Sequence, residues 1–195
     1  MSTEESLSKI QKNWATFVAL TEKAEDPAVN SLIEELGERL AMCPCENVTS
    51  GIGCYPGGLI DVSLRVVNSM RQISKAMDFD ISISSLLKVG LLHQIGKVGD
   101  LEQDLFLDED SDWHREKLGR HYKYNENLQK MSVSHRTHYL LQSFGVKLTP
   151  EEWIAIQISG GSHFEENRFY AGSETDLGVL VQTAASLVRT RDKSS

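Results

Sequence analysis

Histidines and cysteines are the residues of this sequence that could bind a metal, and few of them have the spacing of a metal site. His135 and His138 stand three residues apart, so on a helix they share a face, which suits metal binding but is more often a surface pair. Cys43, Cys45 and Cys54 lie within a stretch of twelve residues. They could supply three ligands of a structural zinc site, but no fourth cysteine or histidine lies nearby, so we expect reduced loop thiols.

The composition is that of an ordinary soluble globular protein. The chain has 195 residues, 40% hydrophobic and 25% charged, a size typical of one compact domain. Its net charge of −8 disfavours extended nucleic-acid binding, which depends on many Lys and Arg contacts to phosphate. No apolar run is long enough for a membrane span, and residues 1–10 are too acidic and polar for a signal peptide. We therefore expect a cytoplasmic protein that does not bind membranes.

The hydrophobic periodicity is helical along most of the chain and predicts an all-α fold. Asp26 followed by Pro27 is typical of a helix start, and Thr149 with Glu152 can form a capping box. The segment 82–95 is apolar almost all round, which predicts a place at the centre of the domain. The expected helices cover residues 4–24, 27–41, 59–77, 82–95, 131–144, 150–159 and 175–190.

Two neighbouring stretches are expected to be exposed loops. Residues 100–112 contain seven acidic side chains, which is typical of a solvated segment. Residues 113–125 are the richest basic and aromatic stretch of the chain, so this loop could contact a nucleotide or a partner protein.

Three segments carry a resemblance to one protein family. Residues 91–99 (LLHQIGKVG) resemble the signature of HD-domain phosphohydrolases, in which a His-Asp pair at a helix end is followed by Ile-Gly-Lys. Upstream, residues 55–64 (YPGGLIDVSL) are similar to the family's Gly-Gly-Leu-x-x-His-Ser-Leu helix, which carries the first metal-binding histidine. Downstream, His135 stands where several members have a histidine opening a helix, and residues 148–156 resemble the run before a further histidine.

The similar segments follow one another in the family's order over about residues 50–190. The resemblance therefore implies a single HD-domain-like helical bundle at residues 42–195, with residues 1–41 forming two extra helices packed on it. In this family His nitrogens and Asp oxygens hold divalent metals, which lower the pKa of a bound water and neutralise a phosphate.

Most metal ligands of the family are replaced in this sequence. Of the six positions that the resemblance assigns, two have a histidine, His93 and His135. Because a metal site needs both the number and the geometry of its ligands, we expect no catalytic metal. The replaced positions are the first histidine at Val62, the aspartate of the His-Asp pair at Gln94, a later histidine at Ser159 and the closing aspartate near Ala185.

The function that we favour is that of a catalytically inactive HD-domain protein that binds a nucleotide-like ligand or a protein partner. Lys97 and Arg136 would flank the former metal site, where cationic side chains could hold a phosphate without a metal. We also expect His93 and Gln94 to hydrogen-bond to each other or to the ligand. The predicted ligand-binding residues are His93, Gln94, Lys97, His135 and Arg136.

Two alternatives stay open. The first is an active metal-dependent nucleotide phosphohydrolase with a rebuilt site for one divalent metal, such as Mn, Co, Ni or Fe. That site would use His93, His135 and one or both of Asp61 and His163. The second is a structural or assembly subunit, in a homo-oligomer or with a partner, whose contacts use the amphipathic N-terminal helices.

Overall fold

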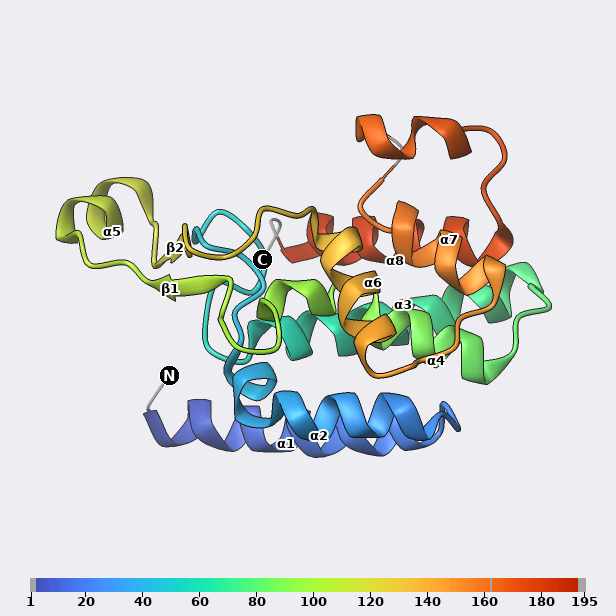
Figure 1. Cartoon of the computed structure of the whole chain (residues 1–195), viewed down its shortest axis with the longest axis horizontal. Helices are drawn as coiled ribbons and strands as arrows, with labels where there is room; N and C mark the ends of the chain where they lie inside the picture. The colour runs from blue at the N-terminus through green and yellow to red at the C-terminus, as the bar shows by residue number, and fades with distance from the viewer. Residues whose placement is uncertain (1–2, 162, 193–195) are drawn as a thin grey trace.

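The chain folds into a bundle of helices, which confirms the all-α prediction (Figure 1). The computed structural model describes residues 3–161 and 163–192, with 63% helix and 5% strand. Within these ranges no helix combines the length and the apolar character needed to cross a membrane. The helices are α1 (Thr3–Glu22), α2 (Pro27–Met42), α3 (Gly58–Met77), α4 (Ile83–Leu92), α5 (Asp112–Leu118), α6 (Val133–Ser143), α7 (Pro150–Ile158) and α8 (Asp176–Asp192), with short 3-10 helices η1 (Ile95–Val98) and η2 (Glu165–Tyr170).

The starts of α2 and α7 follow the capping signals in the sequence. The Asp26 carboxylate accepts a hydrogen bond from the Ala28 amide at 3.1 Å, and Pro27 is the first residue of α2. At α7 the Glu152 amide donates to Thr149 Oγ1 at 3.1 Å, and the Thr149 amide donates back to the Glu152 carboxylate at 2.9 Å. Both predicted helix starts are confirmed, because each cap satisfies backbone groups that the helix itself leaves free.

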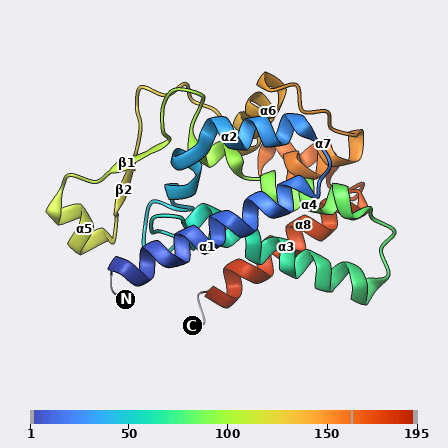
Figure 2. The same cartoon turned by 90° about the horizontal axis from the view of Figure 1, so that it is seen from below.

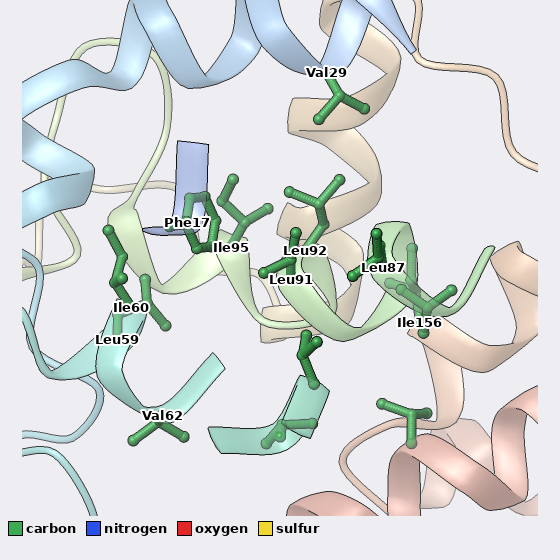
Figure 3. Close-up of a cluster of buried hydrophobic side chains, with 14 of the residues drawn as sticks. Phe17, Val29, Leu59, Ile60, Val62, Leu87, Leu91, Leu92, Ile95 and Ile156 are labelled. Atoms are coloured by element: carbon green, nitrogen blue, oxygen red, sulfur yellow. The ribbon is translucent and has the colours of Figure 1, made fainter. Parts of the chain in front are cut away.

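Helix α4 lies at the centre of the bundle, as its apolar sequence predicts. Figure 3 shows Leu91 and Leu92 in one buried cluster with Phe17 of α1 and Ile156 of α7. Helix α3 packs against α4 and α8, while α1 packs against α2, α3 and α4. The helix ends at Leu92, three residues before the predicted end, and the chain continues into η1.

An arm projects from the bundle at residues 104–125 (Figures 1 and 2). Strand β1 (Phe106–Asp108) pairs antiparallel with β2 (Tyr122–Tyr124), and α5 lies between them in the sequence. The prediction of exposed loops here is wrong in its detail, since aromatic side chains favour pairing of the two strands. Phe106 lies opposite Tyr124, with ring centroids 5.5 Å apart.

Truncation of Phe17 tests how firmly α1 belongs to the bundle. The side chain is 1% exposed, and removing a buried phenylalanine typically costs about 3–5 kcal/mol. We expect Phe17→Ala to lower the free energy of unfolding by about this amount in urea, within one cooperative transition. The control Gln11→Ala, at an exposed position of α1, should change it by less than about 0.5 kcal/mol. A main transition unchanged by Phe17→Ala would mean that α1 does not contribute to the core.

Candidate functional site

A cavity of about 870 Å³ lies where the sequence predicts the site. Its walls come from α3, the segment from the end of α4 into η1, the start of α6, and the C-terminal parts of α7 and α8. The loops at residues 45–52 and 124–132, the start of β1 and residues 163–167 complete the lining. All the positions that the resemblance assigns to metal ligands line this cavity except His135. They are Val62, His93, Gln94, Ser159 and Ala185.

Gly96 determines how closely η1 approaches α6. Its amide donates to Thr137 Oγ1 at 3.0 Å, and its carbonyl oxygen accepts from the Arg136 guanidinium at 3.4 Å. A Cβ at this position would lie 2.5 Å from the Val133 carbonyl oxygen, so a larger residue cannot be placed here without moving a backbone. This contact brings the residues on both sides of Gly96 next to the α6 wall of the cavity.

His93 is a neutral hydrogen-bonding group in the cavity wall. It follows the last residue of α4, is 4% exposed, and its Nδ1 lies 3.0 Å from the Gly90 carbonyl oxygen. Because a carbonyl only accepts, Nδ1 carries the proton and Nε2 has a lone pair. Burial lowers the pKa of His93 to about 4, so the ring is uncharged at neutral pH. Nε2 is therefore available as an acceptor.

Gln94 has a free donor. Its Oε1 accepts a weak hydrogen bond from the Cys45 thiol at 3.6 Å, and burial raises the pKa of Cys45, so the sulfur retains its proton. Its Nε2 is buried and has no hydrogen-bond partner in the described part of the chain. No hydrogen bond joins Gln94 to His93 among these residues. The predicted pairing of the two side chains with each other is therefore not seen.

Lys97 lines the cavity, but a neighbour neutralises its charge. Its Nζ donates to the Cys45 carbonyl oxygen at 2.7 Å and lies 2.8 Å from the Glu46 carboxylate. Burial alone lowers the pKa of Lys97, but the Glu46 carboxylate and the hydrogen bonds to Glu46 and Cys45 outweigh it, and the net pKa is raised. Lys97 thus holds the loop at residues 45–46 against η1, and its charge is already compensated.

Arg136 is a buried cation with no carboxylate beside it. It is 3% exposed, and its guanidinium donates to the carbonyl oxygens of Gly96 at 3.4 Å and Gln129 at 3.0 Å. No ion pair joins it to a carboxylate within residues 3–161 and 163–192. Burial lowers the pKa of Arg136, and the charge of Asp100 offsets this only in part. A guanidinium has five N–H donors, so several are left for a ligand.

His135 is not brought together with the other four predicted residues. Its side chain is exposed, and its backbone amide donates to Ser132 Oγ at 3.4 Å in the cap of α6. His138, three residues on, stacks on Trp153 with ring centroids 4.2 Å apart. The spacing of three therefore does not produce a shared metal-binding face.

Of the two residues considered for a rebuilt metal site, one lies at the cavity. Asp61 faces α1, where its carboxylate accepts from Asn13 at 3.0 Å and from the Tyr55 hydroxyl at 2.6 Å, and it also pairs with Lys9 at 3.4 Å. His163 is exposed at the rim of the cavity. The carboxylate that such a site would need is thus held elsewhere.

The side chains present do not fit a divalent metal. At the ligand positions inside the cavity, His93 has a good metal donor, while Val62 and Ala185 have none and Gln94 and Ser159 are uncharged. In the part of the chain that the structure describes, no three His, Cys, Asp or Glu side chains are grouped so that they could hold a metal. The three cysteines are free thiols. Divalent metals in proteins usually need three or four such ligands.

Further polar residues line the cavity that the sequence analysis did not single out. Gln157 of α7 is 3% exposed; its Nε2 donates to Asn167 Oδ1 at 3.0 Å, while its Oε1 is buried without a partner. Arg189 and Lys130 are exposed at the rim and form no ion pair among the described residues. Two sequence signals could have revealed Gln157 and Arg189. They are the amide within the apolar run IAIQI and the spacing of four from Ala185 to Arg189.

Comparison with known proteins adds no relative. No family model matches the chain, and neither the curated proteins nor the solved structures compared with it give a match. The resemblance to HD-domain phosphohydrolases therefore stays a prediction from the sequence.

The low pKa of His93 predicts a loss of stability in acid. The unfolded chain binds a proton near pH 6.5 and the folded one only near pH 4, so stability falls as the pH drops through this window. At 1.36 kcal/mol per pKa unit, the contribution is at most about 3 kcal/mol. We expect the difference in unfolding free energy between wild type and His93→Leu to shrink by up to this amount from pH 7 to pH 4. A difference that does not vary with pH would show that His93 titrates normally.

Proposed function

We propose that this chain is a catalytically inactive HD-type protein that binds a small nucleotide-like anion in the cavity without a metal. The observation that carries the proposal is the buried guanidinium of Arg136, which lines the cavity and has no carboxylate partner. Burying an unpaired charge costs several kcal/mol, and a phosphate in the cavity would offset that cost. Guanidinium groups also match phosphate oxygens in geometry, because two parallel N–H bonds can form.

The charges around the cavity support an anionic ligand. The chain as a whole has a net charge of −8, whereas the cavity is lined by four Lys or Arg side chains and three carboxylates. One of these cations, Lys97, is already paired with Glu46. The remaining cations have no ion-pair partner among the described residues; they are Arg136, Arg189 and Lys130. They make the cavity locally positive, opposite in sign to the net charge of the chain, and so attract anions to this face.

The size and the apolar walls suit a nucleotide-like molecule. A volume of about 870 Å³ lies within the range of ordinary ligand sites, roughly 300–1,000 Å³. Ile52, Val66, Phe106 and Leu128 supply apolar surface for a flat ring. The ligand would thus place its anionic group near Arg136 and its ring against these side chains.

The donor positions support binding rather than hydrolysis. Metal-dependent hydrolysis needs a cation that activates water, and the cavity has a hydrophobic Val62 and a neutral Gln94 where the ligands should be. In the alternative with a rebuilt site, Asp61 would have to leave Asn13 and Tyr55, and exposed His135 would have to enter the cavity. We therefore favour ligand binding over hydrolysis as the function of this cavity.

Calorimetric titration with ribonucleoside 5′-monophosphates, after treatment with EDTA, tests this proposal. We expect wild type to bind at least one of them, and Arg136→Met to weaken binding about tenfold to a hundredfold, because a charged hydrogen bond contributes about 1.5–3 kcal/mol. The control Arg71→Met, on the exposed surface of α3 outside the cavity, should leave the affinity unchanged.

Two results would contradict the proposal. The first is that wild type binds none of the nucleotides. The second is that binding requires Mn²⁺ and is followed by release of phosphate, which would support the active hydrolase. Urea unfolding of Arg136→Met shows whether a loss of binding reflects a loss of fold.

A further inference from the structure

Two residues that line the cavity each have a buried polar atom with no hydrogen-bond partner in the described part of the chain. One is the donor Nε2 of Gln94, and the other is the acceptor Oε1 of Gln157. They belong to different segments, since Gln94 precedes η1 and Gln157 lies near the end of α7. Buried polar groups are nearly always hydrogen-bonded, and one left without a partner costs about 1–3 kcal/mol. Two such atoms at one cavity indicate a partner that supplies the complementary groups.

Neighbouring hydrogen bonds fix which end of the Gln157 amide is free. Gln157 Nε2 donates to Asn167 Oδ1 at 3.0 Å, and Asn167 Nδ2 in turn donates to the Gly161 carbonyl oxygen at 2.9 Å. Because the carbonyl only accepts, this chain makes Gln157 Oε1 the unpaired atom. At Gln94, Oε1 accepts a hydrogen bond from the Cys45 thiol, and the NH₂ group has no partner among the described residues. Gln94 thus has one unpaired donor and Gln157 one unpaired acceptor, and both groups are uncharged.

Arg136 and Gln157 come from different elements of the cavity wall. Arg136 lies on α6 and donates to Gly96 and Gln129, whereas Gln157 belongs to α7. Val62, Ser159 and Ala185 also line the cavity, and none of them carries a charge.

We propose that Gln94 and Gln157 form a recognition subsite for the neutral edge of a nucleobase, which offers an acceptor to Gln94 Nε2 and a donor to Gln157 Oε1. The inference rests on the proposed function, in which the phosphate lies at Arg136. A site built to hydrogen-bond such groups discriminates strongly against ligands that lack them.

The test compares adenosine and uridine 5′-monophosphates with ribose 5-phosphate, which has the same anion and no base. In wild type, at least one nucleotide should bind more than tenfold more tightly than ribose 5-phosphate. In Gln94→Met and in Gln157→Met this preference should fall by about tenfold each, since one hydrogen bond is lost. The affinity for ribose 5-phosphate should stay within about twofold of wild type, because Arg136 is untouched.

Gln182 is a matched control. Its amide nitrogen is also buried without a partner, but the residue does not line the cavity. Gln182→Met should therefore leave both affinities unchanged. A nucleotide preference that survives Gln94→Met and Gln157→Met would overturn the inference, as would an equal loss of ribose 5-phosphate binding, which would indicate a structural role. If wild type binds neither class of ligand, the proposed function fails together with the inference, and that outcome is distinct from the other two.

Discussion

The close packing of η1 against α6 at Gly96 is the contact on which the cavity depends. The Gly96 amide bonds to Thr137, its carbonyl oxygen accepts from Arg136, and the missing side chain lets the two backbones approach. As a result, the end of the buried helix α4 lies next to the first turn of α6. Replacing any one lining residue would change the chemistry of the cavity, whereas separating η1 from α6 would remove the wall itself.

In this cavity, uncharged side chains stand at most positions where the HD-type pattern has metal ligands. Where the HD-type pattern expects carboxylate and imidazole donors, this chain has Val62, Gln94, Ser159 and Ala185, and the remaining His93 is held neutral by burial. Of the four cations that line the cavity, Lys97 is paired with a carboxylate, and the other three have no ion-pair partner within the described residues. A cavity with unpaired cations, unpaired amide groups and apolar walls matches a ligand with one anionic end and one neutral ring.

Periodicity and capping predicted most of the helices, because both are local properties of the sequence. Asp26 and Thr149 cap the helices that they were expected to cap. The arm was missed because its pairing joins Phe106 to Tyr124 across 18 residues of sequence. The acidic residues at 100–112 and the basic and aromatic residues at 113–125 suggested exposed loops instead. The end of α4 was placed three residues too far along the chain, since Ile95 continues the apolar run but belongs to η1.

The sequence motif predicted which positions line the candidate site, but not the direction in which each side chain points. The resemblance placed five positions that line one cavity, and Lys97 and Arg136 lie there too. It also included His135, which the rotation of α6 leaves in solvent. Gln157 was missed because only the three-dimensional structure shows that one end of its amide lacks a partner.

A crystal structure of the protein grown with a nucleoside monophosphate and Mn²⁺ tests the central claim most directly. Our account predicts phosphate oxygens at roughly 3 Å from the Arg136 guanidinium, the base edge at Gln94 and Gln157, and no ion bound at His93. Manganese coordinated by His93 Nε2, with the phosphate bound to the metal, would contradict the account and support hydrolysis.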